Sequence, residues 1–134
     1  MKIPFISQLN MKLQVLEYKL SIVRLSAGEA IPAWAMTSEF FSISKTKDEL
    51  SIVCDAMVVP QDVLIQNHGW KCIQVVGPLD FALTGILSEL AQPLAQANVS
   101  IFAISTYDTD YLLVKMDTLD KTIEVLASEG HQFV

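Results

Sequence analysis

The chain has 134 residues, of which 51% are hydrophobic and 18% charged, so it can bury a core and is not expected to be disordered. Its net charge is −6, and its Lys and Arg residues are scattered without a basic stripe, which excludes DNA and RNA as expected partners. No apolar run is long enough to cross a bilayer, and the N-terminus lacks a signal-peptide core. A cytoplasmic location without a membrane partner is therefore expected.

The first half of the chain predicts short strands and short helices. Alternating apolar and polar residues indicate half-buried strands, and prolines mark the first turns of two helices. Gly69 is predicted to end the second of these helices, and the first ten residues are expected to form a loose leader. In order, the predicted elements are a strand over residues 12–24, a helix over 33–36, strands over 40–44 and 50–54, a helix over 60–66, and a strand over 70–76.

The second half contains the best-defined helix. Over residues 83–97, apolar side chains recur at helical spacing, and Pro93 is expected to kink this helix or to separate its last turn. Gly130 is predicted to end the last helix. The predicted elements after residue 97 are strands over 99–104 and 111–115, a helix over 119–128, and a strand over 131–134.

An internal repeat organises these elements. Residues 40–73 align without a gap on residues 101–134, so each unit reads β-α-β-β-α-β. Right-handed crossovers place both helices of such a unit on one face of its sheet. The predicted fold is α+β, with ferredoxin-like units in tandem and antiparallel sheets. The first unit is expected over residues 11–69 and the second over 70–134, with the strand 70–76 shared or exchanged between them.

No catalytic or metal-binding constellation is visible. Neither histidine has an acid or a nucleophile at a suggestive spacing, and phosphate-binding glycine motifs are absent. Cys54 and Cys72 lie in apolar runs without metal-ligand spacing, so they are expected to be buried, inert thiols. The chain is therefore predicted not to be an enzyme and to need no cofactor or metal.

A polar turn at residues 105–110 is predicted to approach the start of the long helix. Asp110 has two readings, a carboxylate that holds a ligand ammonium or an ordinary acidic turn residue. The helix start also has two readings: its N–H groups bind a ligand carboxylate, or Asp80 caps them itself. For Asp108 the turn reading is preferred.

Three runs of residues carry a family resemblance: Leu83-Thr84-Gly85-Ile86-Leu87, Pro93-Leu94-Ala95, and Phe102-Ala103-Ile104-Ser105-Thr106-Tyr107-Asp108-Thr109-Asp110-Tyr111. These runs resemble tandem ACT domains. They are most similar to the ACT units of the cytosolic arginine-sensor proteins and of aspartate kinase regulatory domains.

The resemblance implies a non-catalytic module that forms a homodimer and binds a free amino acid at interfaces between ACT units. It also implies a partner enzyme of amino-acid metabolism. Ahead of Thr84 the chain has Phe81-Ala82-Leu83, where an arginine site has an acidic residue, which argues against arginine as the ligand. The ligand-binding residues that it implies are Gly77, Pro78, Leu79, Asp80, Phe81, Leu83, Thr84, Ile104, Ser105, Thr106, Tyr107 and Asp110.

Two functions remain open at this point. One is an amino-acid-binding regulatory module. The other is a dimeric interaction module that acts on a metabolic enzyme without a ligand of its own.

Overall fold

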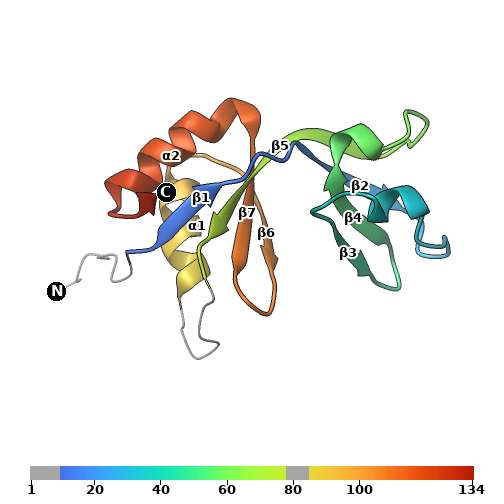
Figure 1. Cartoon of the computed structure of the whole chain (residues 1–134), viewed down its shortest axis with the longest axis horizontal. Helices are drawn as coiled ribbons and strands as arrows, with labels where there is room; N and C mark the ends of the chain where they lie inside the picture. The colour runs from blue at the N-terminus through green and yellow to red at the C-terminus, as the bar shows by residue number, and fades with distance from the viewer. Residues whose placement is uncertain (1–9, 78–84) are drawn as a thin grey trace. The chain divides into compact units, whose positions relative to one another are not determined.

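The structure, a computed structural model, describes residues 10–77 and 85–134 and divides the chain into two compact units (Figure 1). Glu17–Lys71 form one unit, here called the central unit because it is central in the sequence. The residues up to Leu16 and Cys72–Val134 form the other, the terminal unit. Strand β5 (Gln66–Val75) begins in the central unit and ends in the terminal unit.

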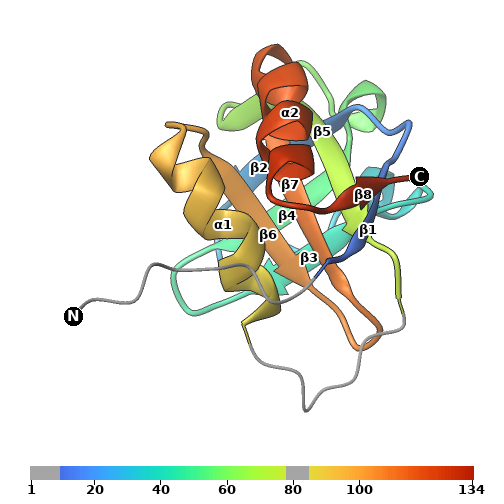
Figure 2. The same ribbon diagram turned by 90° about the vertical axis from the view of Figure 1, so that its left-hand side faces the viewer.

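The terminal unit is a sheet with helices α1 (Ile86–Gln96) and α2 (Leu119–Ser128) on the same face (Figure 2). Its strand order is β6-β7-β5-β1-β8, so β1 lies between β5 and β8. The β1–β5 and β6–β7 pairs are antiparallel, whereas β1 and β8 are parallel. The remaining strands are β1 (Lys12–Val15), β6 (Ile101–Ser105), β7 (Asp110–Lys115) and β8 (Gln132–Phe133), and a short 3-10 helix η3 (Met116–Thr118) precedes α2. The predicted α+β class is confirmed.

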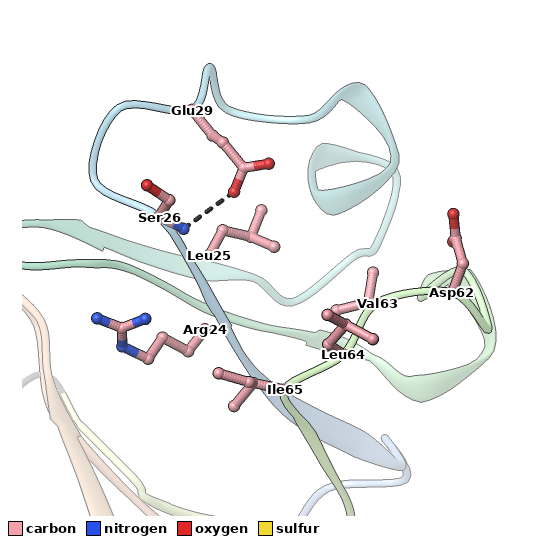
Figure 3. Close-up of a pocket in the computed structure, with 8 residues that line it drawn as sticks. All are labelled: Arg24, Leu25, Ser26, Glu29, Asp62, Val63, Leu64 and Ile65. Atoms are coloured by element: carbon pink, nitrogen blue, oxygen red, sulfur yellow. Dashed lines mark hydrogen bonds between the residues drawn. The ribbon is translucent and has the colours of Figure 1, made fainter.

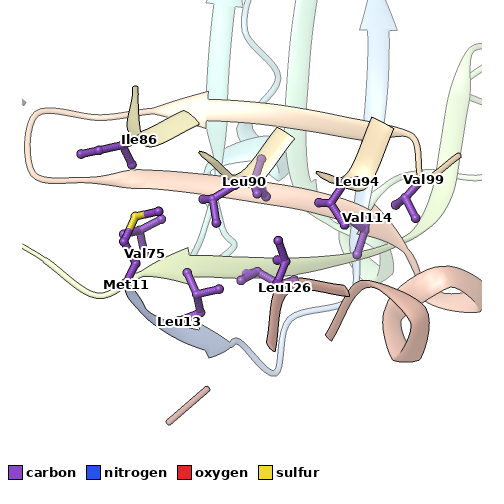
Figure 4. Packing of buried hydrophobic residues seen from close by; sticks show 11 residues of the cluster. Met11, Leu13, Val75, Ile86, Leu90, Leu94, Val99, Val114 and Leu126 are labelled. Carbon is purple, nitrogen blue, oxygen red and sulfur yellow. The ribbon is translucent and has the colours of Figure 1, made fainter. Parts of the chain in front are cut away.

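The core of the terminal unit forms where α1 and α2 pack on the sheet (Figure 4). Leu90 and Leu94 lie one helical turn apart on α1, and neither is exposed to solvent. Leu126 contributes from α2, and Leu112 and Val114 contribute from β7. This stripe explains the helix predicted from the spacing of apolar residues. The described helix continues through Pro93 to Gln96.

The central unit has a sheet of order β3-β4-β2-β5 and only short 3-10 helices among its described residues. Val23, Leu50 and Ile52 form the centre of its core. Its elements are β2 (Leu20–Leu25), η1 (Ala33–Met36), β3 (Ser42–Lys45), β4 (Leu50–Asp55), η2 (Ala56–Val58) and the first part of β5.

The helix predicted over residues 60–66 is wrong. The chain instead turns at Pro60–Val63, where the Val63 N–H donates to the Pro60 carbonyl over 3.2 Å. The Gln66 side-chain amide donates to the Val63 carbonyl at 2.7 Å, which holds the turn against the start of β5. Gly69 therefore lies inside β5. Its φ of +85° accompanies a register shift between β2 and β5, as expected for glycine at an irregularity in a strand.

The single strand predicted over residues 12–24 is also wrong, because the extended chain is interrupted between Val15 and Leu20. At this interruption the Lys19 carbonyl accepts from the Ala56 N–H at 2.9 Å, outside the regular ladder of β2 and β4. The alternation of apolar residues continues across the break, so it does not reveal it.

The two hairpins of the repeat superpose with an offset of 60 residues rather than the 61 of the predicted alignment. The Thr46 N–H donates to the Glu49 carbonyl, and the Thr106 N–H donates to the Thr109 carbonyl, each at 2.9 Å. Because a one-residue slip exchanges the two faces of a strand, the correction matters for the site. Asp110 corresponds to the buried Leu50, not to Glu49.

Candidate functional site

One side-chain hydrogen bond fixes the polar turn of the terminal unit. The Thr109 hydroxyl donates to the Val75 carbonyl at 2.5 Å, and Thr109 is 4% exposed. This bond joins the β6–β7 turn to the end of β5, two residues before Gly77. The turn, the end of β5 and the start of α1 lie at the same end of the unit (Figures 1 and 2).

Thr106 is used inside the turn. Its hydroxyl donates to the Thr109 carbonyl at 3.0 Å and accepts from the Thr109 N–H at 3.3 Å. The Tyr107 side chain, at the tip, is 81% exposed. Hydrogen bonds therefore close the base of the turn, and its tip presents an aromatic ring to solvent.

Asp110 is the polar group that stands out at this end. It is half-buried at the first position of β7, opposite Ser105, where the corresponding residue of the central unit is a buried leucine. Among the described residues, its carboxylate has no hydrogen bond or ion pair. A half-buried carboxylate is costly without a partner, so this position suits a cationic group from outside the described chain.

Tyr111 follows Asp110 in β7, so its side chain lies on the opposite face of the sheet from Asp110. Its hydroxyl accepts from the Gln74 side-chain amide at 3.5 Å. Burial raises the pKa of Tyr111, with smaller contributions from Cys72 and Asp108, so the hydroxyl stays protonated at neutral pH. Sequence reasoning named Thr109 only as part of the turn at residues 105–110 and did not predict its hydrogen bond to Val75. The only available signal was a run of hydroxyl and acidic residues beside a strand.

The predicted site residues divide into two groups. Gly77, Ser105, Thr106, Tyr107 and Asp110 lie at the described end of the unit, with Ile104 half-buried in β6 beside them. The others lie outside the described residues: Pro78, Leu79, Asp80, Phe81, Leu83 and Thr84.

The Thr109 bond can be tested by substitution. Thr109→Val is expected to lower the free energy of unfolding by about 1–3 kcal/mol, because the buried Val75 carbonyl loses a donor. Thr109→Ser keeps a hydroxyl at this position and is expected to retain more of the stability than the valine variant. Urea denaturation of the three proteins measures the difference. A valine variant as stable as wild type would show that the turn is held by other contacts.

Two other side chains that could be reactive, Cys54 and His131, are buried. Burial, assisted by Asp55, raises the pKa of the Cys54 thiol to about 11, which keeps it unreactive at neutral pH. His131 is buried, and its Nδ1 accepts from the Met11 N–H at 3.2 Å. Within the part of the chain that the structure describes, no cluster of His, Cys, Asp and Glu fits a metal ion, and no helix is long and apolar enough to span a membrane.

The ACT domain family model matches residues 66–128, and a model of the N-terminal domain of another family matches residues 18–62. The chain is similar to the human cytosolic arginine sensor for mTORC1 subunit 1, with 34% identity over 121 residues, or 85% of this chain and 36% of the sensor. The chain thus spans about a third of the length of the arginine sensors that it matches.

Solved structures give the same fold. Protein Atu0741 from Agobacterium tumefaciens is 46% identical, with a TM-score of 0.88 over 93% of this chain and 92% of that chain. The regulatory subunit of aspartate kinase from Thermus thermophilus is only 8% identical, with a TM-score of 0.58 over 83% of this chain and 91% of that chain, so it supports the fold alone. The arginine sensors are named as sensors and the aspartate kinase chain as a regulatory subunit, whereas the name of Atu0741 states no role. The ACT domain model over residues 66–128, the arginine sensors and the ferredoxin-like terminal unit agree that this part of the chain is similar to ACT domains.

Proposed function

We propose that this protein is a non-catalytic regulatory module of the cytoplasm that binds a free amino acid at the β6–β7 end of the terminal unit. The observation that carries the proposal is the Thr109–Val75 hydrogen bond, which holds the turn and Asp110 beside the end of β5. Similarity to an arginine sensor and to an ACT-domain model supports an amino acid as the ligand class.

The charges of an amino acid complement this end of the unit. Its ammonium group would donate to the Asp110 carboxylate, a charge-assisted contact. Its carboxylate would lie over the first turn of α1, where N–H groups and the helix dipole favour an anion. Gly85, the N-cap residue of α1, has no side chain to cap those groups.

A binding screen tests the proposal. Each of the twenty amino acids is titrated into the full chain by calorimetry, and one or a few related amino acids are expected to release or absorb heat with saturation. The absence of arginine from that group would agree with Phe81-Ala82-Leu83, which brings no acidic residue to a guanidinium. Heat from none of the twenty would overturn the proposal. It would favour the second function, a ligand-free module that acts on a metabolic enzyme.

The proposal includes a homodimer. In the described part of the terminal unit, β6 pairs with β7 only, so its other edge offers unpaired backbone groups. A symmetric pairing with a second copy is the commonest way to cover such an edge, and the second copy would supply the adjoining ACT unit of the site. Light scattering is expected to report twice the mass of the chain at micromolar concentration. A mass of one chain would count decisively against it.

A further inference from the structure

A pocket lies entirely within the central unit (Figure 3). Its volume is about 380 Å³, within the range of small-molecule sites, which is about 300–1,000 Å³. It forms beside the end of β2, where the Arg24 N–H donates to the Ile65 carbonyl at 3.0 Å. The lining residues come from the end of β2, the loop after it, and the turn before β5: Arg24, Leu25, Ser26, Glu29, Asp62, Val63, Leu64 and Ile65.

Glu29 is the polar group directed over this pocket. One oxygen of its carboxylate accepts from the Ser26 N–H at 2.9 Å, which folds the loop back toward Leu25 (Figure 3). The structure shows no other partner of that carboxylate among the described residues. Asp62 lies at the far rim. Because the pocket has two carboxylates and one guanidinium, its net charge favours a ligand with a cationic group.

The rest of the lining is aliphatic. Leu25 and Val63 are half-buried, and Ile65 is 56% exposed. Leu64 is 96% exposed at the rim, although a leucine gains free energy when it is covered. A ligand with a branched aliphatic body would remove part of this surface from water. The pocket thus combines its two carboxylates with a short apolar wall.

The position of the pocket in the fold supports the idea that it binds a ligand. In the terminal unit, the site proposed above lies where β5 ends beside the β6–β7 turn. In the central unit, this pocket lies where β2 ends, and the Arg24 side chain donates to the Asp48 carbonyl in the β3–β4 turn at 3.0 Å. The pocket of the central unit and the candidate site of the terminal unit therefore lie at corresponding ends of the repeat. The carboxylate, however, comes from Glu29 in the loop, since the position of Asp110 is taken by Leu50.

We propose that this pocket is a second amino-acid site, for an amino acid with a branched aliphatic side chain. The ammonium group binds the Glu29 carboxylate, the side chain packs on Leu25, Val63 and Ile65, and the ligand carboxylate lies on the Arg24 side. The two sites share no residue. The proposal for the second site therefore does not depend on the proposal for the site at Asp110.

Methyl NMR of the full chain tests this second site, with leucine as the probe. The methyl resonances of Leu25, Val63 and Ile65 are expected to shift and saturate together at millimolar leucine. The analogue 4-methylpentanoate keeps the aliphatic body and the carboxylate but lacks the ammonium, and it is expected to cause no saturable shift. Leucine that moves none of these resonances, or an analogue that binds equally well, would overturn the proposal.

Substitutions separate this site from the first. Glu29→Gln still accepts from the Ser26 N–H but loses the charge, so leucine affinity measured from these methyl shifts should fall about tenfold or more. Glu39→Gln, another exposed acid of the central unit outside the pocket lining, is the matched control and should bind as wild type. Asp110→Ala should leave these shifts unchanged. Unaltered leucine affinity in Glu29→Gln would reject the second site. If leucine still shifts these methyl resonances but the screen finds no amino acid whose binding depends on Asp110, only the site at Asp110 is rejected.

Discussion

Replacing Leu90 by alanine is expected to lower the free energy of unfolding by about 2–5 kcal/mol, because a buried leucine loses its contacts and leaves a cavity. Leu90 is fully buried between α1 and the sheet, in the same cluster as Leu94 and Leu126 (Figure 4). A loss of this size is a large fraction of the stability of an ordinary domain. Urea denaturation followed by far-UV circular dichroism measures it.

Leu87 provides the matched control, since it lies on the same helix and is 37% exposed. Leu87→Ala keeps helix propensity high and removes little buried surface, so its effect should be much smaller. Equal losses in the two variants would show that α1 does not pack through Leu90 as described.

Replacing Asp110 by alanine is expected to weaken binding of the amino acid found in the screen by about ten- to hundredfold. The reason is the loss of a charge-assisted hydrogen bond of about 1.5–3 kcal/mol to the ligand ammonium. The fold should stay intact, because the Asp110 side chain has no hydrogen-bond partner among the described residues. Calorimetry measures the affinity, and circular dichroism monitors the fold.

Asp108→Ala is the control for that substitution. Asp108 is an exposed acid of the same turn, so its removal changes the net charge equally without removing the proposed contact. Unchanged affinity in Asp110→Ala would make Asp110 an ordinary turn acid. Unfolding of that variant would give the residue a structural role and place the ligand elsewhere.

The elements that the sequence predicts well are determined by local residue patterns. The bounds of α2 match the prediction, Leu119–Ser128, because an apolar stripe runs through the helix and Gly130 follows it with a φ of +95°. For α1, the described helix begins at Ile86, and residues 83–84 of the prediction lie outside the described part. Both helices bury a stripe that can be read from spacing alone.

The errors have a different origin. In residues 60–66 a proline start and a following glycine imitate helix signals, but the Gln66 amide closes a turn instead. The offset of the repeat is wrong by one in the hairpins. Gly69 and Gly130, which that alignment pairs, lie in a strand and after a helix, respectively. Local sequence patterns do not distinguish a glycine inside a strand from a glycine after a helix, because tertiary structure decides between them.

The candidate site shows the same limit. The run of polar residues at 105–110 was visible in the sequence. The bond that positions it was not, since the Thr109 hydroxyl and the Val75 carbonyl lie 34 positions apart. No periodicity in the sequence links two such residues. A threonine next to a strand is most often interpreted as a residue that stabilises the adjoining turn.

The position of β1 between β5 and β8 has a consequence for synthesis on the ribosome. The central unit is one continuous stretch, Glu17–Lys71, so its β-ladders can form soon after that stretch has emerged. The terminal unit must wait, because β8 pairs Gln132 with Lys12 and Phe133 with Leu13, joining the start of the described chain to its end. Such distant pairing is slow, and domains generally fold as they emerge. We therefore expect β1 to remain without β8 until Gln132 and Phe133 have emerged from the ribosome, and until then the nascent chain relies on the central unit for its first stable structure.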